Sequence, residues 1–154
     1  MSAPLYNPAI LRLAATIPHH ARLGEPQASV ERRSPICGSR VTADVVLDED
    51  GVLAELGLEV RACALGQASA SLMAVHAVGR NVGELVAARD AITAWLAGEG
   101  GDTAEFWPGM DVLAPARAFP ARHASIRLGF EAVAEAALLA SGLAVDPASV
   151  RKAG

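Results

Sequence analysis

The sequence predicts an α+β fold, in which helices pack on a small three-stranded antiparallel sheet. Two neighbouring segments alternate apolar and polar residues with the period of a strand. Asp48-Glu49-Asp50-Gly51 lies between them, and its glycine suits a tight antiparallel hairpin. After Cys63 the apolar spacing becomes helical. The 154 residues suit one domain, 1–154, with a loose tail expected only at 146–154.

The composition narrows the class of protein. Apolar residues make up 52% of the chain and charged residues 19%, as in packed globular proteins. The net charge of -4 argues against binding to a nucleic-acid backbone. No run approaches the roughly 20 apolar residues of a membrane span, and the apolar stretch Ala9 to Ile17 lacks a basic leader, so no membrane segment or signal peptide is predicted. We therefore expect a cytoplasmic protein whose two cysteines are reduced thiols.

The first half of the chain predicts one helix and three strands. Asn7-Pro8 is an N-cap followed by a proline at the first helical position, so a helix should begin there and end before Pro18. Gln27 to Arg33 is a candidate strand with poor alternation. Apolar residues alternate clearly at positions 41–47 and 52–60, which predicts the hairpin.

The second half predicts three helices. The first follows Cys63 and ends at Gly79, and the second begins at a capping box formed by Asn81 and Glu84. The last long helix has an apolar face made of Ile126, Phe130, Val133, Ala134, Ala137 and Leu138.

Three aromatic residues and one methionine in this half are assigned from their local pattern. Met73 and Trp95 fall on apolar helix faces and are assigned to the core. Phe106 and Trp107 lie in a stretch without periodicity and are candidates for a partner-binding surface.

Two cysteines are the candidate reactive groups. Cys37 lies in the turn Ser34-Pro35-Ile36-Cys37-Gly38-Ser39, where partial exposure is expected. Cys63 lies where a strand meets a helix, so N–H groups of the first helical turn should favour its thiolate. Thiolates suit zinc, copper(I) or iron–sulfur clusters, but two of them do not complete a tetrahedral site. Taken singly, each cysteine is also consistent with a buried structural residue.

Three motifs resemble those of one known family. Ser34-Pro35-x-Cys37-Gly38 resembles the Asn-Pro-x-Cys-Gly-Asp turn of IscU and SufU proteins, and Cys63-Ala64-Leu65-Gly66-Gln67-Ala68-Ser69-Ala70-Ser71 resembles their Cys-Ala-Ile-Ser-x-Ala-Ser-x-Ser helix start. Phe119-Pro120-x-Arg122 followed by Leu128 resembles their Pro-x-Arg-x-x-Cys-x-x-Leu segment. The resemblance to the IscU/SufU/NifU-N-terminal family extends roughly from residue 5 to residue 140.

The resemblance implies a metal or cluster site with two replaced ligands. In that family three cysteines and an aspartate surround zinc or a nascent iron–sulfur cluster. Cys37 and Cys63 match two of the cysteines, and Ser39 stands at the aspartate position. The third cysteine falls on Ser125 when counted back from Leu128, or on Ala124 if His123 sets the register. Neither residue is a good ligand for a soft metal.

Nearby residues are further candidates for this site. His123 is a possible third ligand, although a histidine that caps the helix start or faces solvent is the simpler interpretation. Arg122 could hold an anionic cluster or a partner's carboxylate, or be a solvated helix residue. His19-His20 is interpreted as surface loop.

The resemblance implies a non-enzymatic scaffold or carrier for iron–sulfur cluster assembly. Its partners would be a cysteine desulfurase and apo iron–sulfur proteins. A homodimer in which two chains share one cluster is a further possibility. The alternative is a SufE/SufU-like persulfide acceptor, with one thiol as sulfur carrier. A Cys63–His123 hydrolase and an interaction module with a vestigial site are weaker hypotheses.

Overall fold

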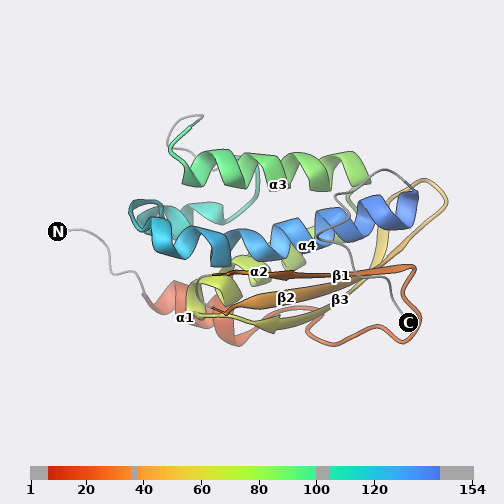
Figure 1. The fold of residues 1–154 in the computed structure, drawn as a ribbon, viewed down its shortest axis with the longest axis horizontal. Helices are drawn as coiled ribbons and strands as arrows, with labels where there is room; N and C mark the ends of the chain where they lie inside the picture. The colour runs from red at the N-terminus through yellow and green to blue at the C-terminus, as the bar shows by residue number, and fades with distance from the viewer. Residues whose placement is uncertain (1–6, 36–37, 100–104, 143–154) are drawn as a thin grey trace.

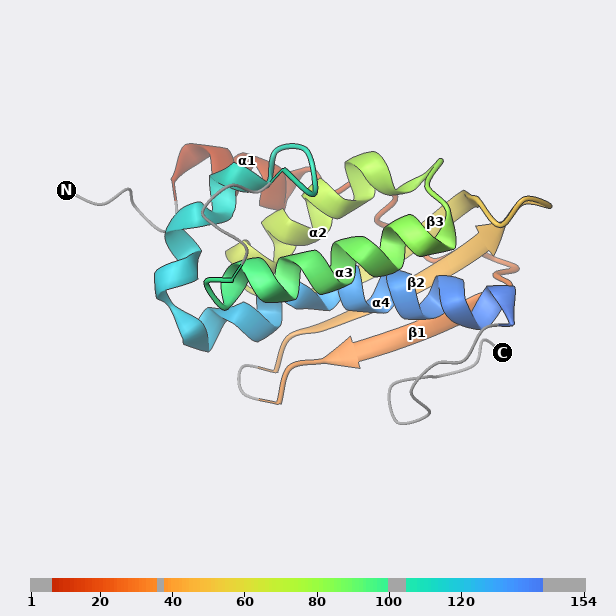
Figure 2. The ribbon, with the colours of Figure 1, turned by 90° about the horizontal axis from the view of Figure 1, so that it is seen from above.

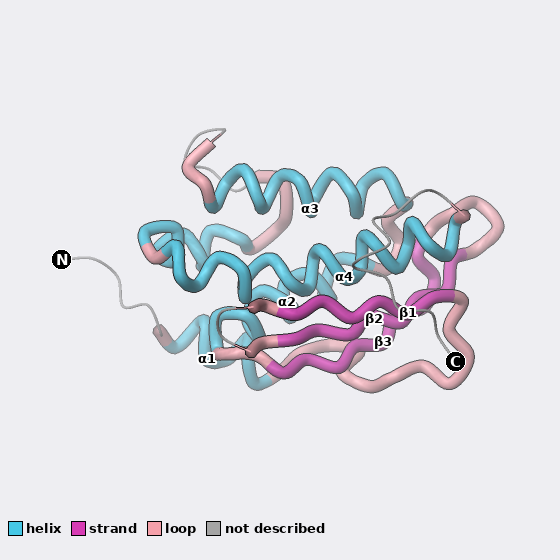
Figure 3. Tube along the Cα trace, viewed as in Figure 1, coloured by secondary structure: helices cyan, strands magenta, loops and turns pink. Residues whose placement is uncertain are grey.

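The computed structural model describes residues 7–35, 38–99 and 105–142 and confirms the α+β class (Figures 1 and 3). The elements, in chain order, are α1 (Pro8–Ala15), β1 (Ala28–Arg33), β2 (Arg40–Leu47), β3 (Leu53–Arg61), α2 (Ala64–Ala77), α3 (Val82–Leu96), the 3-10 helices η1 (Met110–Ala118) and η2 (Pro120–Arg122), and α4 (His123–Ser141). In this described part, no helix is long and apolar enough to span a membrane.

The helix starts follow the predicted caps. The Asn7 side chain accepts a hydrogen bond from the N–H of Ile10 at 3.0 Å, and Pro8 opens α1. At α3, Asn81 and Glu84 form the predicted capping box, with N–H to side-chain oxygen distances of 2.8 and 3.0 Å. Each cap satisfies backbone donors that the first helical turn leaves without a partner.

The sheet has the order β1-β2-β3 and is antiparallel throughout, as predicted. Ala43 of β2 pairs with Val30 on one side and with Leu58 on the other. The weakly alternating segment therefore does form a strand, β1. At the β2–β3 turn Gly51 adopts a φ of +77°, a value that glycine reaches without strain.

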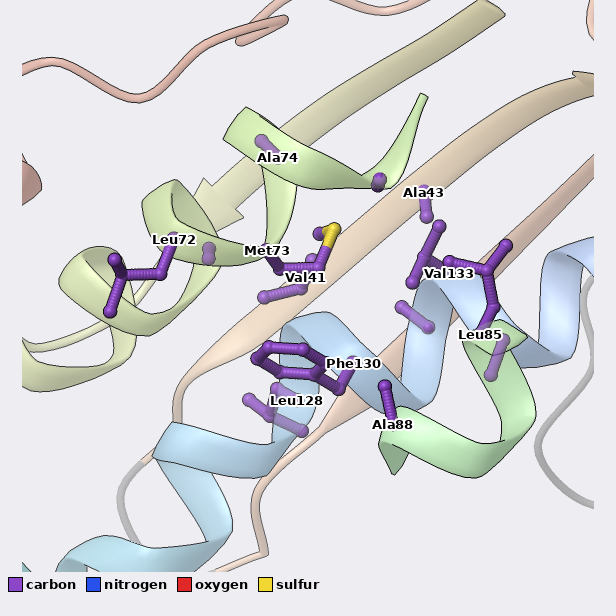
Figure 4. Close-up of a cluster of buried hydrophobic side chains, with 14 of the residues drawn as sticks. Val41, Ala43, Leu72, Met73, Ala74, Leu85, Ala88, Leu128, Phe130 and Val133 are labelled. Carbon is purple, nitrogen blue, oxygen red and sulfur yellow. The ribbon is translucent and has the colours of Figure 1, made fainter. Parts of the chain in front are cut away.

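The core lies between the sheet and the helices. Val41 and Ala43 of β2 face Phe130 and Val133 of α4, and Met73 of α2 joins the same buried cluster (Figure 4). Figure 2 shows α3 lying over α4, so α4 is covered on both sides. The predicted apolar face of the last long helix is thereby confirmed, as is the core position of Met73 and Trp95.

The segment between α1 and β1 runs along the outer face of the sheet. Asp44, whose side chain is fully buried, accepts hydrogen bonds from Arg22 at 2.6 and 3.0 Å, from the N–H of Leu23 at 3.0 Å, and from Ser29. Burial alone would raise the pKa of this carboxyl, but these bonds outweigh burial and hold it below its ordinary value. These hydrogen bonds to Asp44, called the Asp44 clamp below, hold the segment between α1 and β1 against the sheet.

The histidine pair lies in this connection and is exposed, as predicted. His19 has a φ of +58°, and its carbonyl accepts a hydrogen bond from the N–H of Leu58 at 2.9 Å. The Nε2 atom of His20 accepts from the N–H of Val60 at 3.3 Å. Both contacts satisfy backbone donors of the edge strand β3.

One prediction for the aromatic residues is wrong. Trp107 is only 1% exposed, its Nε1–H donates to the carbonyl of Leu72 at 2.8 Å, and its ring meets Phe130 edge to face. Phe106 is half-buried against Trp95. The stretch lacks helical periodicity because it is an irregular turn that leads into η1, so its buried residues show no regular spacing.

Candidate functional site

Cys63 occupies the junction predicted for it. β3 ends at Arg61 and α2 begins at Ala64, so Cys63 is the N-cap residue of α2. Its carbonyl accepts the N–H of Gln67 at 2.9 Å, but its side chain makes no capping hydrogen bond. The half-buried sulfur atom therefore does not cap the start of α2.

Two serine hydroxyls from distant segments are linked to this sulfur, one directly and one through the other. The Sγ atom of Cys63 is 3.4 Å from the Oγ atom of Ser125, in the first turn of α4. The Ser125 hydroxyl donates in turn to the Oγ atom of Ser39 at 3.2 Å, just before β2. Ser125 is 2% exposed and Ser39 4% exposed. The hydrogen bonds link the side chains in the order Cys63, Ser125, Ser39 and so connect the start of α2, the start of α4 and the residue before β2.

Small residues allow the first turns of α2 and α4 to approach each other. A Cβ atom at Gly66 would collide with the hydroxyl of Ser125 and with Ala62. One turn further on, the buried hydroxyl of Ser69 donates to the carbonyl of Ile126 at 2.7 Å. Ser69 therefore joins α2 to α4. The glycine and the hydroxyl together place Ser125 against Cys63.

The β1–β2 loop is closed at its base. The N–H of Ser34 donates to the carbonyl of Ser39 at 2.8 Å, continuing the pairing of Arg33 with Arg40. Cys37 lies within this loop in the sequence, but residues 36 and 37 fall outside the described residues. The predicted meeting of Cys37 with Cys63 is therefore untested.

The structure brings together three of the positions that the motifs singled out. The residue of α4 that meets Cys63 is Ser125, which agrees with the register counted back from Leu128 and not with the one that selects Ala124. Ser39, at the aspartate position of the motif, completes the group. The motifs placed both serines at the site but did not indicate that they bond to each other. The small residue Gly66 was a sequence signal for the close approach of Ser125 to the start of α2.

His123 is engaged elsewhere through one ring nitrogen. Its Nε2 atom lies 3.2 and 3.0 Å from the carbonyl oxygens of Ala116 and Arg117, so Nε2–H is the donor there. His123 thereby caps the end of η1, and only Nδ1 could serve as a ligand. Arg122 is half-buried in η2, one residue before α4.

The donor atoms described at this site are one thiol and two hydroxyls. A hydroxyl is a hard ligand that stays protonated near neutral pH, so it holds zinc or iron poorly but donates well to a thiolate. Within residues 7–35, 38–99 and 105–142, no three His, Cys, Asp or Glu side chains are grouped closely enough to hold a metal ion. These atoms therefore form a hydrogen-bonded group that includes one sulfur, and they do not make a complete metal site.

The fold and the site together define a class of small α+β domains. Here a cysteine between the last strand and the next helix lies against the start of the long final helix, and that helix start is hydrogen-bonded to the residue before β2.

Comparison with known proteins identifies the family. The chain is 38% identical to the amino-terminal part of a nitrogen-fixing NifU-like protein from Brucella abortus, with a TM-score of 0.82 over 91% of this chain and 96% of that one. It is also 26% identical to the iron–sulfur cluster assembly scaffold protein IscU of Thermotoga maritima, over 86% of this chain and 92% of IscU. The chain belongs to the IscU/SufU/NifU-N-terminal family.

A third protein shares the fold at lower identity. It is a SufU from Fervidobacterium islandicum AW-1, described as an iron–sulfur cluster assembly scaffold for the SUF system, with 17% identity and a TM-score of 0.79 over 86% of this chain and 96% of that one. No protein-family model matches the chain.

Proposed function

We propose that this protein is a carrier in iron–sulfur cluster assembly, in which Cys63 is the principal thiolate and Cys37 the second. The observation that supports this most is the Cys63 sulfur at 3.4 Å from Ser125, because three distant motif positions meet there. The names of the relatives, IscU and a NifU-like protein, point to the same process.

A transient cluster or a zinc ion would be held incompletely by one chain. Two thiolates supply half of the four ligands that a cluster or a structural zinc site uses. The remaining ligands would come from a second copy of the chain or from the apo-protein that receives the cluster. Such weak holding suits a protein that must release its cargo.

A second function, that of a persulfide acceptor, is favoured by the two hydroxyls. In this reaction the Cys63 thiolate attacks the terminal sulfur of a persulfide on a cysteine desulfurase. A new S–S bond forms at Cys63, the S–S bond on the desulfurase breaks, and its electron pair stays on the desulfurase cysteine as a thiolate. No external oxidant is needed. The Ser125 hydroxyl, which donates to Ser39 in the structure, would turn to donate to the new persulfide anion and would then accept a hydrogen bond from Ser39.

Anaerobic reconstitution tests the carrier function. The protein is incubated with iron and sulfide, and bound cluster is measured by visible absorption and metal analysis. We expect a coloured species in the parent, no colour in Cys63→Ser, and a weaker or shorter-lived colour in Cys37→Ser. A parent protein that stays colourless and metal-free would refute cluster carriage.

Sulfur loading separates the second function from the first. The protein is incubated with a cysteine desulfurase and cysteine, and the mass of each cysteine-containing peptide is measured without reduction. A gain of one sulfur atom on Cys63, without cluster formation in the first assay, identifies a persulfide acceptor. Absence of both products, with Cys63→Ser indistinguishable from the parent, would leave only an interaction module with a vestigial site.

A further inference from the structure

Three arginines form a row across the sheet next to Cys63. Arg33 of β1 pairs with Arg40 of β2, and Arg40 pairs with Arg61 of β3. Residues paired in this way point to the same face of a sheet. The neighbouring residue Val41 is buried in the core, so the arginines point to the opposite, outer face.

Each of the three arginines lies within two residues of the β1–β2 loop or of Cys63 in the sequence. Arg33 precedes Ser34, the first residue of the β1–β2 loop, and Arg40 follows Ser39 at the end of that loop. Arg61 is two residues before Cys63. A molecule that approaches Cys63 from the outer side of the sheet would therefore meet the guanidinium groups.

The guanidinium groups are accessible and only partly neutralised. The side chains of Arg33 and Arg61 are 62% and 65% exposed, and that of Arg40 is 31% exposed. Arg33 and Arg40 share one carboxylate, that of Glu31, at 2.8 and 3.9 Å, and Arg61 lies 3.8 Å from Glu59. Exposed ion pairs of this kind are weak. The row thus remains positive on a chain whose net charge is -4.

The arrangement opposes the local stability of the sheet. Like charges directly across neighbouring strands repel, and here two such neighbours occur in succession. An unfavourable arrangement that borders a reactive site is consistent with a role in binding.

The charges around the row favour a protein over a polyanion as its partner. Glu31 and Glu59 occupy the next rung on the same face, on either side of Thr42. These carboxylates would repel a continuous line of phosphates, such as a nucleic acid or an anionic membrane. A protein surface can place its own carboxylates opposite the arginines and avoid the glutamates.

We propose that Arg33, Arg40 and Arg61 dock an acidic surface of the protein that delivers sulfur to Cys63. This inference rests on the proposed sulfur-handling function and adds the chemistry of the partner's surface. The donor is the partner in question because its sulfur must reach bonding distance of Cys63, which brings its surface over the adjacent strand ends. Electrostatic attraction over this distance accelerates encounter and is screened by salt.

The test measures the second-order rate of sulfur transfer from a cysteine desulfurase to Cys63 at increasing sodium chloride concentration. The variant is Arg33→Glu/Arg61→Glu, and Arg33→Gln/Arg61→Gln is a milder form in case charge reversal disturbs folding. Arg12→Glu, in exposed α1, is the control for a general change in charge. Labelling by a neutral maleimide, measured by mass on the peptide that contains Cys63, reports whether this thiol is equally accessible in all of them.

We expect the Glu variant to lose roughly tenfold or more of the rate at low salt, the Gln variant to lose less, and the control to match the parent. The parent rate should fall with salt and approach that of the Glu variant, while maleimide labelling stays unchanged.

Three results would overturn the inference. Equal rates and equal salt dependence in the parent and the Glu variant would overturn it and leave the sulfur-acceptor function intact. Failure of the parent itself to accept sulfur would overturn both. Binding of the parent to anionic phospholipid vesicles or to RNA, abolished in the Glu variant, would assign the row to a polyanion instead.

Discussion

Replacing Ser125 by cysteine should add a thiolate next to Cys63 and so make a tighter metal site. Two thiolates that share one tetrahedral zinc ion at about 2.3 Å each lie about 3.8 Å apart. In the structure the Cys63 sulfur is already 3.4 Å from the Ser125 hydroxyl, so a small rotation of either side chain reaches that spacing. Gly66 has no Cβ atom to collide with the side chain at position 125.

The gain in affinity can be estimated from the number of ligands. A four-ligand structural zinc site contributes about 10 to 16 kcal/mol, or roughly 3 kcal/mol for each ligand. Since 1.4 kcal/mol corresponds to a factor of ten, Ser125→Cys should bind zinc roughly 100-fold more tightly than the parent. The added ligand should also raise the midpoint of thermal unfolding when zinc is present.

A competition titration against a chromophoric chelator, under reducing conditions, measures this change. The reductant prevents a disulfide between Cys63 and the new cysteine. Ser141→Cys, at the exposed end of the same helix, controls for the addition of a thiol that lies outside the site. If Ser125→Cys binds zinc no more tightly than Ser141→Cys, position 125 is not the position of a metal ligand.

Three further predictions concern stability. Gly66→Ala should lower the free energy of unfolding in urea by about 1 to 3 kcal/mol, because the new methyl group would collide with Ser125. The control Gly24→Ala, where a Cβ atom would meet nothing within 4 Å, should change it by less than about 1 kcal/mol. Equal effects would contradict the close approach of α2 and α4. Ser69→Ala should cost about 1 to 2 kcal/mol, since a carbonyl of α4 loses its buried donor, and Ser141→Ala is the exposed comparison. Because the folded pKa of Asp44 is below its ordinary value of 3.8, its contribution is complete above that value and is lost as the pH falls through the folded pKa. Asp44→Asn should therefore be about 2 to 3 kcal/mol less stable than the parent at pH 7, with a smaller difference near pH 2, and a difference that does not shrink in acid would rule out the clamp as its origin.

Features that depend on neighbouring residues could be predicted from the sequence. The Asn7 cap, the Asn81–Glu84 capping box and the turn at Gly51 each form between residues a few positions apart, so their motifs were sufficient. The junction at Cys63 was predicted for the same reason, because alternation ends where helical spacing begins. The resemblance to known motifs then indicated the family.

Features that join distant segments needed the tertiary structure. The burial of Trp107, the clamp on Asp44 and the row formed by Arg33, Arg40 and Arg61 each depend on which residues the folded chain sets side by side.

The contact between Cys63 and Ser125 shows the difference most clearly. The sequence by itself determined that a cysteine would begin α2 and that a serine or an alanine would stand near the start of α4. Only the tertiary structure decided that Ser125 faces the sulfur and links it to Ser39, because that contact requires α2 and α4 to approach each other at Gly66. Spacing along a chain specifies local hydrogen bonds, whereas the distance between two helices is specified by the side chains that pack between them.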